Sequence, residues 1–204
     1  MDEREILIRK ATLDDLEGIF YLYANYMFDS YSLKFGDSFV KEYLKIIINS
    51  RDCITLVVEN SSLIGFIMAT FSSEKILSKL FFNIELLRLW VVQFLRTPCL
   101  AFEILELILY PYKCRLKDTD AELLFIAIEP AYRKRELATE LITQVLNLMR
   151  QKNIANVKVS AIVRNEAVNG LLKKNGFEVR KKIRLFKKYM YLYSFNVSAK
   201  EMID

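Results

Sequence analysis

At 204 residues, the chain has the length of one domain with a full hydrophobic core, and its hydrophobic fraction of 53% excludes a disordered protein. It contains no histidine and only three, widely spaced cysteines; this excludes serine–histidine and cysteine–histidine catalysis, most transition-metal sites and a disulfide framework, and it favours a reducing, cytoplasmic compartment. The net charge of +5 favours anionic partners, and a phosphorylated cofactor and a nucleic acid fit it equally well.

The first fifty residues predict one strand and two helices. A short apolar strand is expected over residues 6–9, and Thr12 is typical of the N-cap of the helix that follows. A second helix is predicted over residues 39–49. The segment between the helices, residues 25–37, is rich in tyrosine and phenylalanine, which fits either the wall of a pocket or ordinary core.

Two apolar runs follow, over residues 53–59 and 63–71, with the polar turn Asn60-Ser61-Ser62 between them. This pattern predicts a β-hairpin. Gly65 lies inside the second run, where a glycine indicates a bulge or the close approach of another chain segment.

Residues 73–119 form the least regular part of the sequence. Residues 79–95 are apolar nearly all round, and Thr97-Pro98 is typical of the start of a second helix, which is expected to reach about Tyr110. Charged residues interrupt any span of membrane length, so a transmembrane helix is not expected. Three interpretations remain: the segment packs on the domain, forms a homodimer interface, or lies on a membrane surface.

The stretch from residue 120 to residue 139 predicts a strand, a turn and a helix. Residues 123–128 are an apolar run of strand length, and Pro130 ends it. The basic turn Arg133-Lys134-Arg135 comes directly before a helical pattern. A helix N-terminus offers unpaired N–H groups and the positive end of the helix dipole, so three cations beside it predict an anion site, most naturally for phosphate. A surface turn with solvated cations is the alternative.

The last fifty residues predict a strand, a helix and a hairpin. Residues 156–163 alternate between apolar and polar side chains, which indicates a strand. Residues 165–174 predict a helix that Asn175-Gly176 closes. A final hairpin is expected from residues 177–186 and 189–195.

Two of these segments resemble the signature motifs of the GNAT superfamily of acetyl-CoA-dependent N-acetyltransferases. Motif A is a strand ending in residue-x-Pro, then Tyr-Arg and an Arg/Gln-x-x-Gly-x-Gly/Ala turn that opens a helix; the turn here is Arg133-Lys134-Arg135-Glu136-Leu137-Ala138. Val163-Arg164-Asn165-Glu166-Ala167 and Leu171-Leu172-Lys173-Lys174-Asn175-Gly176-Phe177 resemble motif B. The chain departs from the family at Glu136, where a glycine is usual, and at Leu172, where a tyrosine is usual.

The resemblance implies an α/β (α+β) GNAT acyl-CoA N-acyltransferase fold, with a mixed, mostly antiparallel sheet of about seven strands flanked by helices. It implies one N-acetyltransferase domain over residues 1–204, with residues 73–119 as a hydrophobic two-helix insert before the central strand. Acetyl-CoA is the implied cosubstrate, and no metal is expected.

The resemblance also assigns residues to the cosubstrate. Backbone groups of Ile126, Ala127 and Ile128 are expected to pair with the pantetheine arm, like an added strand. Asn165 is expected either to bond the pantetheine or to act as an ordinary helix N-cap. The pyrophosphate is expected at the turn and helix start formed by Arg133, Lys134, Arg135, Glu136, Leu137, Ala138 and Thr139.

Glu122 is the candidate catalytic base, since a chain without histidine must use another proton acceptor. Strand alternation predicts that its side chain shares a face with Leu124, Ile126 and Ile128. Residues 121–128 are also similar to the strand that carries the catalytic glutamate in the histone-acetyltransferase branch of the family. A glutamate at the solvated start of an edge strand is the alternative.

The predicted activity is transfer of an acetyl group from acetyl-CoA to a primary amine by direct attack. The expected acceptor is a small molecule, with an amino sugar among the candidates; protein N-termini and lysines are the alternative acceptors, and nucleic acid is not an expected partner. The alternative is a GNAT-fold CoA-binding or regulatory module with weak or lost catalysis, because Glu136 and Leu172 depart from the motifs. A third interpretation, a basic RNA-binding domain, is supported by the net charge alone.

Overall fold

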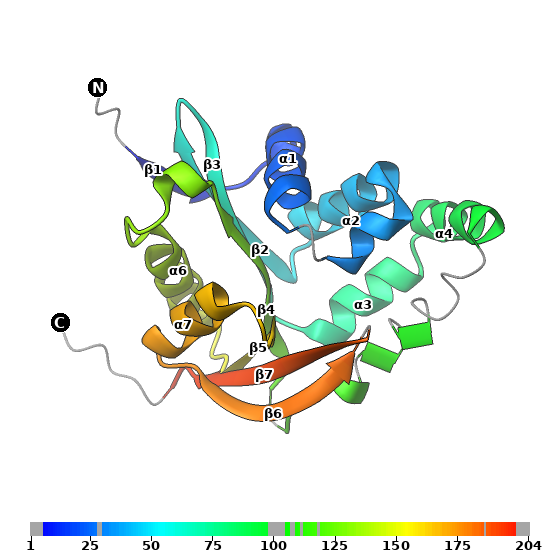
Figure 1. Cartoon of the computed structure of the whole chain (residues 1–204). Coiled ribbons are helices and arrows are strands. Elements are labelled where there is room, and N and C mark those ends of the chain that lie inside the picture. Colours follow the sequence, from blue (N-terminus) through cyan, green and yellow to red (C-terminus); the bar gives the residue numbers. More distant parts are fainter. Residues whose placement is uncertain are drawn as a thin grey trace.

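The computed structural model describes residues 6–27, 30–97, 105–106, 109–110, 112–117, 119–185 and 187–198. Within these ranges seven strands form one sheet in the order β1-β2-β3-β4-β5-β7-β6 (Figure 1). The strands are β1 (Leu7–Lys10), β2 (Cys53–Asn60), β3 (Ser62–Thr70), β4 (Ala121–Ile128), β5 (Asn156–Ile162), β6 (Glu178–Leu185) and β7 (Lys188–Asn196). Neighbours run antiparallel except β4 and β5, which run parallel. The mixed, mostly antiparallel sheet that the sequence predicts is confirmed.

Helices cover both faces of the sheet (Figure 1). The α-helices are α1 (Leu16–Tyr26), α2 (Asp37–Asn49), α3 (Ser73–Phe81), α4 (Ile84–Arg96), α6 (Leu137–Gln151) and α7 (Glu166–Lys174). Short 3₁₀ turns occupy η1 (Leu13–Asp15), η2 (Tyr31–Phe35) and η4 (Pro130–Tyr132). One buried core lies between the sheet and α6, and a second lies between the sheet and the helices α1 to α4.

The sheet opens between β4 and β5. Only three residue pairs join these strands, from Ala121 opposite Val157 to Leu123 opposite Val159. Beyond Leu123, β4 continues to Ile128 paired with β3, whereas β5 continues to Ile162 paired with β7. The two strands therefore diverge, and they leave one backbone edge of β4 without a strand partner among the described residues.

A β-bulge at Leu124 changes which way the β4 side chains point. Phe125 pairs with Met68 and Leu123 pairs with the next residue of β3, Ala69, so Leu124 is an extra residue in the ladder. As a result Ile126 and Ile128 pack in the core under α6, whereas Leu124, Phe125 and Ala127 pack in the other core. The prediction that Glu122 shares a strand face with Ile126 and Ile128 is therefore wrong, because simple alternation fails at the bulge.

Gly65 lies both beside a β-bulge and at a close approach of another chain segment, the two features that the sequence indicated. The register of β2 and β3 shifts beside the pair formed by Val58 and Gly65. A Cβ atom on Gly65 would lie 2.4 Å from Cδ1 of Ile128 and 3.1 Å from the carbonyl oxygen of Ala127. The missing side chain thus lets β3 lie close to the end of β4.

The apolar run at residues 79–95 is interrupted where the sequence shows no break. Helix α3 ends at Phe81, and the side chain of Asn83 caps α4 by accepting a hydrogen bond from the Leu86 amide at 2.9 Å. The second predicted helix, from Thr97-Pro98 to Tyr110, lies largely outside the described residues. In the part of the chain that the structure describes, no helix has the length and apolar character needed to span a membrane.

Candidate active site

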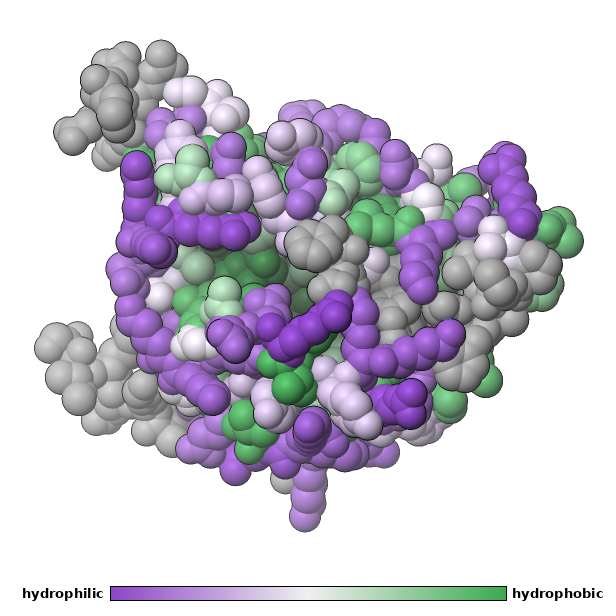
Figure 2. Space-filling view, viewed as in Figure 1, coloured by the Kyte–Doolittle hydropathy of each residue, from purple (hydrophilic) through white to green (hydrophobic). Residues whose placement is uncertain are grey.

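A cavity of about 390 Å³ runs from the opening between β4 and β5 to the helices on the other side of β4. Ile126 and Ser160 line it at the strands, Leu172 lines it at α7, and Tyr23 and Trp90 line it at α1 and α4. Figure 2 shows a hollow in this face of the molecule whose floor is hydrophobic and whose rim is hydrophilic. A largely apolar cavity with a few polar groups is the usual form of a small-molecule site.

Glu122 lies in the wall of this cavity and is only 2% exposed. The Ser73 hydroxyl donates a hydrogen bond to its Oε2 at 2.9 Å, and the Tyr110 hydroxyl donates a short one to its Oε1. The ammonium of Lys158, itself 4% exposed, lies 3.6 Å from Oε2. A buried carboxylate needs such partners, since an isolated one would lose its hydration without compensation. The alternative of a solvated edge glutamate is therefore excluded.

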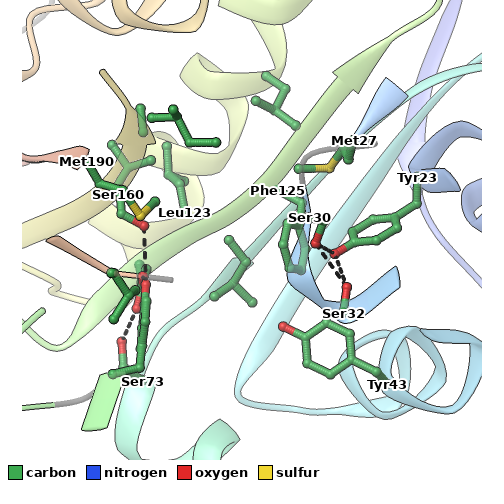
Figure 3. Close-up of a pocket in the computed structure, with 18 of the residues that line it drawn as sticks. Tyr23, Met27, Ser30, Ser32, Tyr43, Ser73, Leu123, Phe125, Ser160 and Met190 are labelled. Atoms are coloured by element: carbon green, nitrogen blue, oxygen red, sulfur yellow. Dashed lines mark hydrogen bonds between the residues drawn. The ribbon is translucent and has the colours of Figure 1, made fainter. Parts of the chain in front are cut away.

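The insert supplies two of these three partners. Ser73 begins α3; its amide donates to the carbonyl oxygen of Asp120 at 2.8 Å, directly before β4, and its hydroxyl oxygen lies 2.9 Å from the same carbonyl. Tyr110 reaches Glu122 and also lies 3.3 Å from the hydroxyl of Ser160 on β5 (Figure 3). In its described residues, the segment 73–119 thus forms part of the site, in line with the interpretation that it packs on the domain.

Burial keeps the other acids of this region protonated. Burial and the nearby carboxylate raise the pKa of Tyr110 well above its usual value. The same two causes raise the pKa of the Cys114 thiol to about 12, and burial raises the pKa of the Cys53 thiol. Neither of these cysteines is a thiolate at neutral pH, so neither is an activated nucleophile. Cys99 lies outside the described residues.

The predicted pantetheine strand lies at the open edge of β4. Ile126, Ala127 and Ile128 pair on one side with Ile67, Phe66 and Gly65 of β3. Their other edge faces the opening between β4 and β5. An extended chain with amide groups can add to such an edge by backbone hydrogen bonds.

The turn before α6 holds an unusual backbone. Lys134 has φ of 63° and Glu136, the N-cap of α6, has φ of 59°, so both occupy the left-handed region. Glycine populates this region at little cost, whereas other residues are disfavoured there. The chain thus keeps the turn shape that glycine usually permits, although it carries lysine and glutamate at these positions. Successive amides in such a turn form a concave anion site, here at a helix N-terminus.

The charge of Glu136 is directed to another cation. Lys174 at the end of α7 contacts both carboxylate oxygens of Glu136, at 2.7 and 2.8 Å, and lowers its pKa. Arg133 donates a hydrogen bond from Nε to the carbonyl oxygen of Ile128, five residues earlier in the chain, at 2.9 Å. Arg135 lies over the ring of Tyr132. Arg133 and Arg135 thus contact other groups, whereas the Glu136 side chain points to Lys174 on α7.

The remaining predicted residues frame the start of α6 and α7. Leu137 is buried in the core under α6, and Ala138 packs against that core. The hydroxyl of Thr139 accepts a hydrogen bond from Asn175 at 3.5 Å. Asn165 caps α7, since its side chain accepts from the Val168 amide at 3.2 Å, and it also lines the cavity.

Sequence reasoning missed the residue that holds β5 and α7 together. The side-chain NH₂ group of Asn169 donates to the carbonyl oxygens of Ile162, Val163 and Asn165, at 3.0, 3.0 and 2.8 Å. Its oxygen accepts a hydrogen bond from the Tyr193 hydroxyl at 2.7 Å. An asparagine on the buried side of a helix pattern is the signal that could have identified it.

Leu172 occupies the position where the family has a tyrosine. It is 2% exposed, packs in the core under α6 and lines the cavity. Its aliphatic side chain has no proton to donate to a leaving thiolate. Among tyrosines that could supply the proton instead, Tyr110 lines the cavity, whereas Tyr112 is 75% exposed. Tyr132 packs at the edge of the core under α6.

Comparison with known protein families gives one match. The family model described as "Acetyltransferase (GNAT) family" matches residues 16–177. Comparison with curated protein sequences finds no match.

Solved structures of low sequence identity share the fold. The ribosomal-protein-S18-alanine N-acetyltransferase from Escherichia coli is 12% identical, with a TM-score of 0.60 over 98% of this chain and 99% of that one. PaiA N-acetyltransferase from Thermoplasma acidophilum, in complex with coenzyme A, is 17% identical, with a TM-score of 0.57 over 94% and 99%. NAA60 from Arabidopsis thaliana, in complex with acetyl-CoA, is 15% identical, with a TM-score of 0.61 over 96% and 100%.

The family match covers both the strand with Glu122, which lines the cavity, and the turn before α6. The chain therefore belongs to the acetyltransferase (GNAT) family of acyltransferases.

Proposed function

We propose that the protein transfers the acetyl group of acetyl-CoA to the primary amine of a small-molecule acceptor by direct attack. The observation that carries the proposal is the buried carboxylate of Glu122 in a cavity that begins at the open edge of β4. The acceptor amine and the thioester of acetyl-CoA can meet at such a point without contact with bulk water. The acetyl-CoA complexes of similarly folded proteins support the choice of cosubstrate.

The chain has features that fit acetyl-CoA. The unpaired edge at Ile126, Ala127 and Ile128 suits the amide-containing pantetheine arm, and the left-handed turn before α6 suits the pyrophosphate. Lys174 neutralises the one carboxylate at that turn, Glu136. Phosphates at a helix N-terminus also gain from the helix dipole.

The reaction needs one proton to leave nitrogen and one to reach sulfur. The amine nitrogen attacks the thioester carbonyl carbon, a C–N bond forms, and the C–S bond breaks. Glu122 accepts the proton that nitrogen loses, and a backbone N–H on the open edge of β4 can stabilise the carbonyl oxygen as it becomes negative. Tyr110, which donates to Glu122, is the group in this wall that can return a proton to the leaving thiolate.

The alternative, a GNAT-fold CoA-binding or regulatory module with weak or lost catalysis, is favoured by one observation. Glu122 already has three partners: two hydroxyl donors and an ammonium. An attacking amine must therefore compete with these donors for the carboxylate oxygens. This alternative predicts that CoA binds and that no amine is acetylated.

The test is Glu122→Gln, which keeps the size of the side chain but removes the base. The release of CoA with an amine acceptor should fall about 10²- to 10⁴-fold in kcat, the usual contribution of a general base, while calorimetric binding of acetyl-CoA stays the same. The control is Glu178→Gln at an exposed position of β6, which should change neither quantity. Unchanged kcat in Glu122→Gln would remove Glu122 from the mechanism.

A further inference from the structure

The acceptor side of the cavity is lined by aromatic side chains, and its role as an acceptor site rests on the proposed function. Between the strands and the helices α1 to α4, the wall includes Tyr23, Phe39, Tyr43, Phe81, Trp90 and Phe125. The ring of Phe125 lies edge to face against Tyr23 at 5.0 Å and against Tyr43 at 5.9 Å. Such a wall suits a flat apolar body, and it can also attract an ammonium group over the ring faces.

Three hydroxyl groups form a closed triangle in this wall. The hydroxyl of Tyr23 lies 2.5 Å from that of Ser30 and 2.7 Å from that of Ser32, and the two serine oxygens lie 2.9 Å apart (Figure 3). Three hydroxyl protons serve three contacts, so none remains to be donated, whereas each oxygen keeps a lone pair. Burial raises the pKa of Tyr23, so the phenol stays neutral. The triangle therefore accepts a hydrogen bond from a ligand and does not donate one.

Trp90 adds one donor to the same wall. Its indole N–H is buried and has no hydrogen-bond partner among the described residues. A buried donor without a partner is rare and gains free energy when a ligand oxygen meets it. The wall thus offers acceptor oxygens at the triangle and, separately, an unpaired donor at Trp90.

In Figure 3 the triangle lies to one side of Phe125, and Ser73, which contacts Glu122, lies to the other. The cavity extends from Glu122 past Phe125 to the triangle. An acceptor with one aromatic ring, a short alkyl linker and a polar group at each end has the shape to span it.

We propose that the acceptor is a hydroxylated arylalkylamine. Its amine lies at Glu122, its ring packs against the aromatic wall beside Phe125, and its hydroxyl donates to the triangle of Tyr23, Ser30 and Ser32. An amino sugar fits this wall poorly, because several of its hydroxyls would face apolar side chains without partners.

The experiment compares amines that differ at one atom or group. With acetyl-CoA, kcat/KM should be highest for 4-hydroxyphenethylamine and about 10-fold lower for phenethylamine, as expected for one net hydrogen bond. It should be lower again for 4-methoxyphenethylamine, which cannot donate to the triangle. Glucosamine and a short peptide with a free N-terminus complete the panel.

Variants locate the effect. Tyr23→Phe and, independently, Ser32→Ala should bring the ratio between 4-hydroxyphenethylamine and phenethylamine close to one. Tyr21→Phe is the matched control, since Tyr21 lies on the same helix but is 59% exposed; it should leave the ratio unchanged.

Two failures are distinguishable. If acetyl-CoA does not bind, the proposed function fails, and the acceptor inference fails with it. If acetyl-CoA binds and glucosamine or the peptide is acetylated in preference to the arylalkylamines, only the acceptor inference is overturned. Equal kcat/KM for the hydroxy and methoxy compounds also overturns it.

Discussion

Glu136 combines two costs that the sequence motif normally avoids, a left-handed backbone and a negative charge beside an anion site. Its carboxylate is directed to Lys174, which ties the start of α6 to the end of α7. This arrangement explains how the turn can keep its shape without glycine. It also consumes a lysine that would otherwise be available to phosphate.

Replacement of Glu136 by glycine should therefore tighten acetyl-CoA binding. We expect Kd to fall about 2- to 5-fold, the effect of one surface charge near a helix N-terminus, and calorimetry at low salt measures it. Glu136→Gln is the matched variant, because it removes the charge but retains the left-handed residue. Equal tightening in both variants assigns the effect to charge; no tightening in either would contradict the prediction.

Asp15 provides a test of pH dependence away from the cavity. It accepts two hydrogen bonds from the Arg9 guanidinium, both at 2.8 Å, and one from the Thr12 amide at 2.8 Å. The Arg9 hydrogen bonds hold its pKa below the usual 3.8. A lowered folded-state pKa stabilises the protein above the unfolded-state value, and this contribution is lost as the pH falls through the folded-state value.

Asp15→Asn should therefore lower the free energy of unfolding by about 1–2 kcal/mol at pH 7. The difference from the wild type should narrow as the pH falls below about 4. Urea denaturation at pH 7 and pH 3 measures both values. Asp14→Asn, at an exposed neighbouring position, is the control and should have little effect; a difference for Asp15→Asn that persists at pH 3 would argue against the ion pair as its cause.

At the scale of elements, β4 is shaped by its neighbours on both sides. Gly65 lets β3 approach its end, and the bulge at Leu124 turns Glu122 toward α3 and Tyr110 instead of α6. The site therefore depends on features of two strands that lie far apart in the sequence.

Gly65→Ala should be destabilising by about 1–2 kcal/mol, because the new methyl group must displace the end of Ile128 and presses on the Ala127 carbonyl. Acetyl-CoA binding should weaken with it, since both residues lie at the open edge. Gly170→Ala in α7 meets nothing within 4 Å and should instead stabilise the helix by about 0.5–1 kcal/mol. Thermal and urea denaturation compare the two, and a neutral Gly65→Ala would show that the strands can separate freely.

Local patterns predicted most of the elements, and tertiary contacts account for what they missed. The hairpin of β2 and β3, the strand and helix around the basic turn, and the cap at Gly176 follow from short-range rules of periodicity and turn chemistry. The three partners of Glu122 could not be predicted. Ser73, Tyr110 and Lys158 are separated from it by 49, 12 and 36 residues, and only the folded sheet brings them together.

Two errors have the same physical origin. The alternation rule misplaced Glu122 because a bulge adds one residue to a strand without a clear sequence signal. The break between α3 and α4 was missed because the residues around Asn83 are as apolar as the helices themselves. Each case depends on a single residue, which a pattern averaged over many positions does not resolve.

At the scale of the molecule, the two halves of the sheet are joined by three residue pairs between β4 and β5. The described part of α4 also leaves Ile84, Leu87, Val91 and Leu95 exposed on one side. That this face contacts a second copy or a membrane surface stays a prediction. A ligand that fills the opening would connect the two halves more firmly than the protein alone.

Saturating CoA should therefore raise the melting temperature. At a free concentration of 100 times Kd, mass action adds about 2.7 kcal/mol, which corresponds to about 5–10 °C for a chain of this size. Scanning calorimetry measures the shift. Adenosine 3′,5′-bisphosphate, which lacks the pantetheine arm, should give a smaller shift at the same concentration, and an equal shift would mean that the opening between the strands is not filled.

The position of Trp90 gives the cavity its own optical reporter. It is the one tryptophan in the chain, and its ring lies 5.6 Å from Phe81 and 6.1 Å from Phe39 in the wall of the cavity. Indole emission responds to the polarity of its surroundings and to quenching by nearby groups. Intrinsic fluorescence therefore reports occupancy of one place in this molecule without any label, and a titration followed at a single wavelength can rank unlabelled amines before any turnover is measured.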